Sequence, residues 1–448
     1  LQWNKNTSAT GYELQKWDGK KWVSLTKINK NSTTTYTVKS LKASTTYKYR
    51  IRAYKTIGKA TQYSGYSATL SVNTNPTNMS GFKAKSKTAT SITLQWNKNT
   101  SATGYELQKW DGKKWVTLTK INKNSTTTYT VKSLKASTTY KYRIRAYKTI
   151  GKATQYSAYT TTLSVNTNPT NMGGFKAKSK SYNSITLQWN KNASATGYEL
   201  QKWDGKKWVS LTKIAKNSTT TYTVKGLKAS TTYKYRIRAY KTIGKATQYS
   251  AYTATLSVNT NPSNMSGFKA KAKSYNSITL QWNKNTSATG YELQKWDGKK
   301  WVSLTKIAKN STTTYTVKSL KTSTTYKYRI RAYKTIGKTT QYSAYTATLS
   351  VNTNPTNMGG FKAKSTAKTS VTLQWNKNTS ATGYEIQKWN GKKWVSAAKV
   401  TKNSTVTSTV KSLKKNTSYK FRVRAYKTIG KATQYSSWSG TLTVKTKK

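Results

Sequence analysis

The segment Thr139-Tyr140-Lys141-Tyr142-Arg143-Ile144-Arg145-Ala146-Tyr147 decides the fold, because every second side chain in it is apolar or aromatic. A period of two is typical of a β-strand with one buried face. The side chains expected to face the core are Tyr140, Tyr142, Ile144 and Ala146. Those expected to face outward are Lys141, Arg143, Arg145 and Tyr147.

Two further segments upstream predict strands. Residues 105–110 and Trp115-Val116 flank Asp111-Gly112-Lys113-Lys114, and Asp-Gly is favoured in hairpin turns because both residues tolerate positive φ. Residues 91–96 alternate as well, which places Ile92, Leu94 and Trp96 on one face. With roughly seven short strands and no helical pattern, we predict an all-β sandwich.

The pattern recurs every 93 residues, as the four prolines Pro76, Pro169, Pro262 and Pro355 mark. A unit of this size can bury its own core. The chain therefore divides into five expected domains: 1–76, 77–169, 170–262, 263–355 and 356–448. Leu1 aligns with Leu94, so we expect the first unit to lack its first strand and the natural chain to continue upstream. The fifth unit differs most from the others, as a terminal cap would.

One motif carries a family resemblance. Leu134-x-Ala136-x-Thr138-x-Tyr140, followed by Tyr142-Arg143-Ile144-Arg145-Ala146, resembles the corner and F strand of fibronectin type III domains. The resemblance covers the whole chain and implies a tandem array of fibronectin type III, immunoglobulin-like β-sandwiches. It implies core roles for Trp96, Tyr105 and Leu107. It also implies that Tyr140 is a tyrosine corner whose hydroxyl bonds to nearby backbone. The equivalent tyrosines are Tyr47, Tyr233, Tyr326 and Tyr419.

The sequence departs from the family at two points. The corner position that is often proline in the family holds Ala43, Ala136 and Ala229 in the first three units and Thr322 and Lys415 in the last two. The loop over residues 149–155 lacks the Arg-Gly-Asp tripeptide, so the resemblance does not imply integrin binding.

The link over residues 75–82, between the first and second units, is too short to be flexible. We therefore expect an extended rod of on the order of 150 Å, in which Met79 fills a domain edge rather than the junction.

The amino-acid composition excludes several classes of function. The chain has 81 Lys and Arg against 9 Asp and Glu, a net charge of +72, which favours polyanionic partners. It has no His and no Cys, which removes His-based catalysis, thiol nucleophiles, Cys/His zinc sites and disulfides. We expect no cofactor and no metal. No apolar run approaches the 18 or more residues of a membrane helix, so no membrane insertion is expected.

The nine acidic residues also argue against an enzyme. Five glutamates occupy the position of Glu106, on the outward register beside Arg143 and Arg145, where a cross-strand ion pair is expected. Four aspartates occupy the position of Asp111, and the fifth unit has Asn390 there. Glycoside hydrolysis needs two carboxylates that face one bond. These carboxylates are therefore interpreted as structural, and no catalytic residue is predicted.

The basic residues predict binding instead. An excess of one sign that is repeated five times favours multivalent binding to polyanions. The candidate residues are Lys109, Lys113, Lys114, Arg143, Arg145, Lys148 and Lys152. The aromatic surface candidates are Trp17, Trp22, Trp110 and Trp115. Such pairs can stack on sugars or bases, but packing within the hairpin is the interpretation we favour.

These observations predict a non-enzymatic, secreted or cell-surface bacterial protein that forms a structural or adhesive rod or fibre. Its expected partners are anionic cell-wall polymers or glycans, with sequence-independent nucleic-acid binding and self-association into fibres as further candidates. The alternative is that these units are C-terminal accessory modules of a larger secreted cell-wall or polysaccharide hydrolase. A third hypothesis is that another subunit donates the strand that the first unit lacks.

Overall fold

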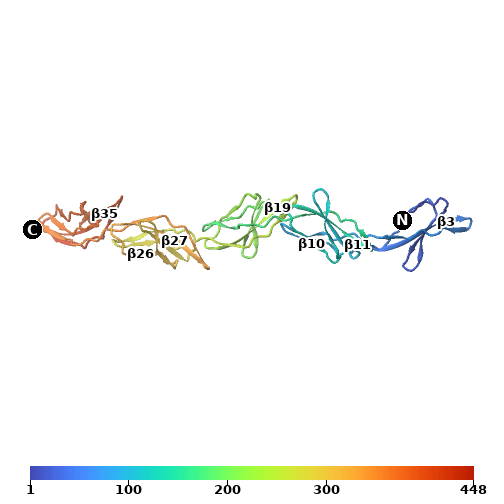
Figure 1. Cartoon of the computed structure of the whole chain (residues 1–448). Helices are drawn as coiled ribbons and strands as arrows, with labels where there is room; N and C mark the ends of the chain where they lie inside the picture. The colour runs from blue at the N-terminus through green and yellow to red at the C-terminus, as the bar shows by residue number, and fades with distance from the viewer. The chain divides into compact units, whose positions relative to one another are not determined.

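A computed structural model describes residues 1–448. Every regular element in it is a β-strand (Figure 1), which confirms the predicted all-β class. The chain divides into two compact units. One comprises Leu1–Phe175, Trp189–Thr220 and Tyr235–Thr255, and the other comprises Lys176–Gln188, Thr221–Lys234 and Leu256–Lys448. No helix of the length and apolarity needed to cross a membrane is present.

The strands follow the 93-residue period. The first repeat contains β1 (Gly11–Trp17), β2 (Trp22–Ile28), β3 (Thr46–Ile57), β4 (Ala60–Tyr63) and β5 (Leu70–Asn73). The second contains β6 (Lys83–Lys87), β7 (Ile92–Gln95), β8 (Gly104–Trp110), β9 (Trp115–Ile121), β10 (Thr128–Val131), β11 (Thr139–Ile150), β12 (Ala153–Tyr156) and β13 (Leu163–Asn166). The third contains β14 (Lys176–Lys180), β15 (Ile185–Gln188), β16 (Gly197–Trp203), β17 (Trp208–Ile214), β18 (Thr221–Val224), β19 (Thr232–Ile243), β20 (Ala246–Tyr249) and β21 (Leu256–Asn259).

The last two repeats have the same eight strands. The fourth contains β22 (Lys269–Lys273), β23 (Ile278–Gln281), β24 (Gly290–Trp296), β25 (Trp301–Ile307), β26 (Thr314–Val317), β27 (Thr325–Ile336), β28 (Thr339–Tyr342) and β29 (Leu349–Asn352). The fifth contains β30 (Lys362–Thr366), β31 (Val371–Gln374), β32 (Gly383–Trp389), β33 (Trp394–Val400), β34 (Thr407–Val410), β35 (Ser418–Ile429), β36 (Ala432–Tyr435) and β37 (Leu442–Lys445).

The second repeat is a sandwich of two antiparallel sheets. The small sheet has the order β10-β7-β6, and the large sheet has the order β12-β11-β8-β9 with β13 also paired to β11. The predicted hairpin is confirmed, since β8 and β9 pair antiparallel with Trp110 opposite Trp115. Gly112 in its turn has a φ of 111°, a conformation that glycine adopts without strain.

The core of the second repeat lies between these sheets. The small sheet contributes three buried side chains from β7 and the residue after it, Ile92, Leu94 and Trp96. The large sheet contributes Tyr105 and Leu107 from β8. The alternation predicts all five. From β11, Tyr142, Ile144 and Ala146 have no exposed surface, and Tyr140 is half-buried against them. Met79 packs against this same core, in agreement with a domain-edge role.

The prediction that Tyr147 faces outward into solvent is wrong. It belongs to the outward register of β11, yet only 4% of it is exposed. Gly104 lies opposite it and has no side chain to compete for the space: a Cβ at Gly104 would lie 2.8 Å from the Tyr147 hydroxyl. The Tyr147 ring also packs against Tyr156 at 6.2 Å, and its hydroxyl donates to Asn122 Oδ1 at 2.7 Å. An outward register therefore does not make this residue exposed.

Two hydroxyls organise the chain between β12 and β13. The Ser157 Oγ accepts from the Ala146 amide at 2.9 Å, and the Thr160 Oγ1 accepts from the Ile144 amide at 3.2 Å. Their own amides donate back to the carbonyls of Ala146 and Ile144 at 2.9 Å. These side chains replace part of a strand ladder, so the final strand is split in two and the repeat has eight strands rather than about seven.

The first repeat has only the large sheet, from β1 to β5. Gln2 and Thr35 form an isolated antiparallel bridge where the other repeats pair two strands of the small sheet. Leu70 and Val72, whose equivalents Leu163 and Val165 pack in the core of the second repeat, are accordingly exposed.

Candidate functional site

The outer side of the large sheet carries a stack of alternating aromatic and guanidinium groups. In the second repeat we call it the arginine–aromatic face and define it as Trp115, Arg143, Tyr159, Arg145 and Tyr156. The Arg143 guanidinium carbon lies 4.5 Å from the Trp115 ring centroid and 4.0 Å from that of Tyr159. The Arg145 carbon lies 4.4 Å from Tyr159 and 3.9 Å from Tyr156. Each guanidinium is thus held between two rings, a favourable cation–π arrangement.

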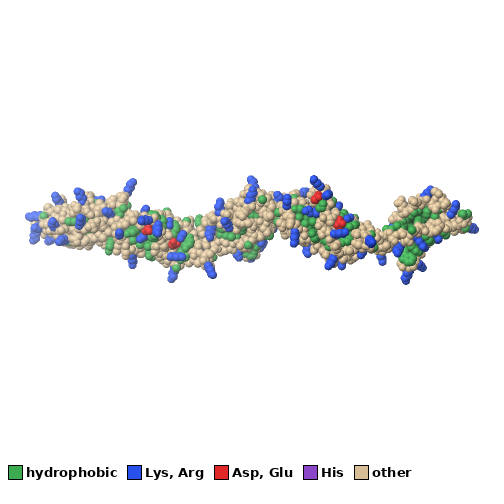
Figure 2. Space-filling view, viewed as in Figure 1, with side chains coloured by type: hydrophobic (Ala, Val, Ile, Leu, Met, Phe, Trp, Pro, Cys, Tyr) green, Lys and Arg blue, Asp and Glu red, His purple; other side chains and the backbone are tan.

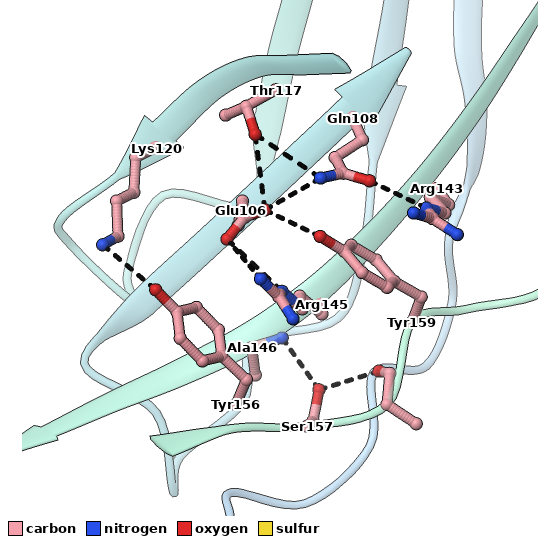
Figure 3. Close-up of polar contacts among 11 residues, drawn as sticks. Glu106, Gln108, Thr117, Lys120, Arg143, Arg145, Ala146, Tyr156, Ser157 and Tyr159 are labelled. Atoms are coloured by element: carbon pink, nitrogen blue, oxygen red, sulfur yellow. Dashed lines mark hydrogen bonds and ion pairs between the residues drawn. The ribbon is translucent and has the colours of Figure 1, made fainter. Parts of the chain in front are cut away.

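Glu106 lies beneath this face, and only 7% of it is exposed. Arg145 Nη2 donates to Glu106 Oε2 at 2.9 Å, the Tyr159 hydroxyl donates to Oε1 at 2.7 Å, and Gln108 Nε2 donates to Oε1 at 3.0 Å (Figure 3). Burial alone would raise the pKa of Glu106, but the hydrogen bonds from Tyr159 and Arg145 and the Arg145 charge hold it below its usual value. The predicted cross-strand ion pair is confirmed, with Glu106 opposite Arg145.

The other repeats contain the same ion pair. Its members are Arg52–Glu13 at 2.6 Å and, each at 2.7 Å, Arg238–Glu199, Arg331–Glu292 and Arg424–Glu385. In the fifth repeat Trp438 replaces Tyr159, and its ring stacks on Arg422 at 4.3 Å and Arg424 at 4.4 Å. Trp438 has no hydroxyl to donate, and the Glu385 side chain is 21% exposed against 9% for Glu106.

The four aspartates are turn residues. Asp111 Oδ1 accepts from the amides of Lys113 and Lys114, both at 2.8 Å, and these backbone hydrogen bonds lower the pKa of Asp111. Asp18, Asp204 and Asp297 accept in the same way. Asn390 makes the same two bonds in the fifth repeat. All nine carboxylates of the chain therefore have a structural partner within their own repeat.

The predicted polyanion-binding residues fall into three groups: two arginines, two half-buried lysines and three exposed lysines. Arg143 and Arg145 belong to the arginine–aromatic face, where rings and polar groups already engage them. The Lys109 ammonium lies 5.3 Å from the Tyr140 ring centroid, and Lys148 is half-buried on β11. The exposed members are Lys113, Lys114 and Lys152, all in turns. Lysines of this kind are spread over the visible surface, with few acidic side chains among them (Figure 2).

The predicted tryptophan pairs pack edge to face. Trp17 and Trp22, like Trp110 and Trp115, have ring centroids 5.5 Å apart, and all four residues are half-buried. The remaining repeats have equivalent pairs at 5.5 to 5.6 Å. Such pairs stabilise a hairpin without a ligand, and Arg143 already stacks on Trp115. This geometry supports the packing interpretation.

The tyrosine corner has the geometry that the resemblance implies. The Lys135 amide donates to the Tyr140 hydroxyl at 2.8 Å. Tyr47, Tyr233, Tyr326 and Tyr419 accept equivalent bonds at 2.7 to 2.8 Å.

The sequence analysis did not single out the outer side of the small sheet. We call it the threonine–lysine face, and in the second repeat it consists of Lys83, Lys85, Thr93, Gln95, Thr128 and Thr130. Thr93 lies opposite Thr130, with their hydroxyl oxygens 3.0 Å apart. The alternation of residues 91–96 and 128–131 contains the signal for this face, because the polar side chains between the apolar ones must point outward.

Paired antiparallel sheets, a tyrosine corner and a buried tryptophan define an array of immunoglobulin-like sandwiches. Five segments match the fibronectin type III domain, at residues 1–69, 74–163, 167–255, 261–348 and 353–441. The chain belongs to the fibronectin type III family, as the sequence resemblance implied.

Relatives of the chain include three large bacterial proteins. Exoglucanase B from Cellulomonas fimi is 30% identical over 304 residues, which are 64% of this chain and 26% of that protein. Endoglucanase B from the same species is 26% identical over 289 residues, 59% of this chain and 26% of that protein. Chitinase A1 from Niallia circulans is 29% identical over 228 residues, 47% of this chain and 28% of that protein. The chain spans about a quarter of the length of these relatives.

Proposed function

We propose that this array is a non-catalytic, extracellular bacterial element that extends as a rod and binds anionic polymers through many weak contacts. The observation that carries the proposal is that the acidic groups and the arginines are paired within the repeats, whereas many lysines are exposed to solvent. All nine carboxylates and the paired arginines are used inside the repeats, whereas exposed lysines such as Lys113, Lys114 and Lys152 face solvent. The net charge of +72 therefore comes mainly from lysine side chains that a polyanion can contact.

Repetition supports the same proposal. Five nearly identical repeats supply valency, and linked weak contacts raise overall affinity about 10²- to 10⁴-fold when they engage together. The relatives support an extracellular setting, because they are named for action on glucan and chitin, and polymers of that size are met outside the cell. The absence of cysteine makes the fold independent of disulfide formation.

The test is binding of the whole chain to dextran sulfate, with uncharged dextran as the control. We expect binding to dextran sulfate that weakens steeply between low and high salt, since exposed charges are screened, and no binding to dextran. Equal binding to both polymers, or none to dextran sulfate, would contradict the proposal.

A second candidate is favoured by the relatives. Each matches this chain over about a quarter of its own length, which fits an array joined to other domains of a polysaccharide hydrolase. Intact mass and terminal sequencing of the native protein separate the two candidates. A catalytic module on the same polypeptide would support the second, and a polypeptide of repeats alone would support the first.

A further inference from the structure

The threonine–lysine face of each complete repeat is a polar surface of lysine, threonine and glutamine side chains. We propose that this face, in the second to fifth repeats, is a binding surface for an anionic polysaccharide. The inference rests on the polyanion binding of the proposed function and adds a location and a ligand chemistry to it.

The face is built from three paired strands. In the second repeat Lys83 lies opposite Gln95, and Gln95 lies opposite Thr128. One row further along, Thr93 lies opposite Thr130. Lys85 stands at the bulge in β6, between Ala84 and Ser86. The hydroxyl and amide groups therefore form two adjacent rows that run across the strands. Within a row, groups on neighbouring strands are about 4.8 Å apart, and ammonium groups lie along one edge.

The hydroxyls of this face are held in place before any ligand binds. Threonine is stiff at χ1 because of its branched Cβ, and the Thr93 and Thr130 hydroxyls hold each other at 3.0 Å. The third, fourth and fifth repeats have the same contact, as Thr186–Thr223 at 3.0 Å, Thr279–Thr316 at 3.0 Å and Thr372–Thr409 at 2.9 Å. Groups that lose little freedom on binding reduce the entropic cost of association.

The charge on this face is not neutralised by acidic residues. None of the nine carboxylates lies on β6, β7 or β10, because Glu106 belongs to β8 and Asp111 to the turn after it. Lys83 and Lys85 are exposed, and Lys132, which directly follows β10, is exposed as well. This differs from the arginine–aromatic face, where Glu106 balances Arg145.

The same features favour a sugar polymer over other polyanions. Hydroxyl and amide groups both donate and accept hydrogen bonds, as sugar hydroxyls do. Nucleic-acid bases are commonly held by stacking on aromatic rings, but Tyr129, the aromatic residue of β10, packs inward against the core. Amphipathic segments that bind membranes bury apolar side chains among the lipids, and this face presents none, since Ala84 packs inward.

The fifth repeat supplies an independent comparison. Beneath the face, Ser408 replaces Tyr129, Val371 replaces Ile92 and Val406 replaces Thr127. Above it nothing changes: the equivalent residues are Lys362, Lys364, Thr372, Gln374, Thr407 and Thr409. The six outer side chains are thus retained in the fifth repeat although side chains beneath them differ.

The first experiment separates this face from diffuse charge. In the whole chain, one variant combines Lys85→Gln, Lys178→Gln, Lys271→Gln and Lys364→Gln. The matched control removes the same four charges from exposed loop lysines, as Lys123→Gln, Lys216→Gln, Lys309→Gln and Lys402→Gln. We expect the affinity for dextran sulfate to fall at least about tenfold in the face variant and less than about threefold in the control. Equal losses would overturn the proposed face and leave polyanion binding intact.

The second experiment tests for sugar recognition. The variant Thr93→Val, Thr186→Val, Thr279→Val and Thr372→Val keeps every charge and the branched shape of the side chain. We expect it to bind dextran sulfate about three- to tenfold more weakly, because the sugar hydroxyls lose hydrogen-bond partners. We expect a smaller loss for inorganic polyphosphate, because its oxygens only accept hydrogen bonds and its binding depends mainly on charge. An unchanged affinity for dextran sulfate overturns sugar recognition. Tighter binding of the unmodified chain to single-stranded poly(dT) than to dextran sulfate, with that binding weakened in the Lys85 face variant and not in its control, would assign the face to nucleic acid instead.

Discussion

The position of Phe421 offers a precise test of the core. The second and fourth repeats carry Tyr142 and Tyr328 there, whose buried hydroxyls have no hydrogen-bond partner. Burial raises the pKa of both tyrosines. A buried polar group without a partner costs about 1–3 kcal/mol. Phe421→Tyr introduces such a hydroxyl in the fifth repeat, so we expect it to lower the free energy of unfolding of that repeat by about 1–3 kcal/mol.

Hydrogen exchange followed by mass spectrometry measures this in the whole chain. Peptides from residues 418–426 are unique to the fifth repeat, since Phe421 and Val423 differ from the residues in the other repeats. A loss of 1–3 kcal/mol corresponds to exchange that is roughly 5- to 150-fold faster. The control is Lys420→Gln, an exposed position on the same strand, which should leave exchange unchanged. Unchanged exchange in Phe421→Tyr would refute the reasoning, because the hydroxyl would then have found a partner.

Three further predictions concern the second repeat and its equivalents. The lowered pKa of Glu106 means that its contribution to stability is present above the unfolded pKa of about 4.3 and is lost as the pH falls through the folded value. Urea unfolding at pH 7 and pH 3 should show this loss, and a Glu106→Gln variant that keeps the full pH dependence would contradict it. Gly104→Ala places a Cβ 2.0 Å from the Ile121 carbonyl oxygen and should cost about 1–3 kcal/mol in thermal unfolding. Gly173→Ala, whose nearest neighbour is 3.6 Å away, is the control and should be close to neutral. Tyr140→Phe removes the acceptor of the corner hydrogen bond and should cost about 0.5–1.5 kcal/mol, which denaturant unfolding would measure. No change there would show that the corner bond adds nothing.

The sequence predicted the features that depend on local pattern. Alternation placed Ile144 and Leu107 in the core, and Asp111-Gly112 located the hairpin, because strand period and turn chemistry involve residues close in the sequence. The Glu106–Arg145 pair was also predicted, because the family resemblance places the strand of Glu106 beside that of Arg145, and outward residues of neighbouring strands can pair.

Features that depend on distant segments were not predicted. Tyr159 covers Glu106 from a segment 53 residues downstream, and Tyr147 is buried because Gly104 on the adjacent strand leaves room for its ring. The Thr93–Thr130 contact joins residues 37 apart on strands that are not consecutive. Each requires the tertiary register of two strands, which alternation within one strand does not specify.

Polymer length tests the central claim, multivalent binding through repeated lysines, most directly. Affinity of the whole chain would be measured for a short sulfated oligosaccharide and for long dextran sulfate at equal sulfate concentration. Multivalent binding predicts that the long polymer binds at least about a hundredfold more tightly, with a steeper loss of affinity as salt is added. Equal affinity for the two, expressed per sulfate group, would contradict the account and indicate a single site.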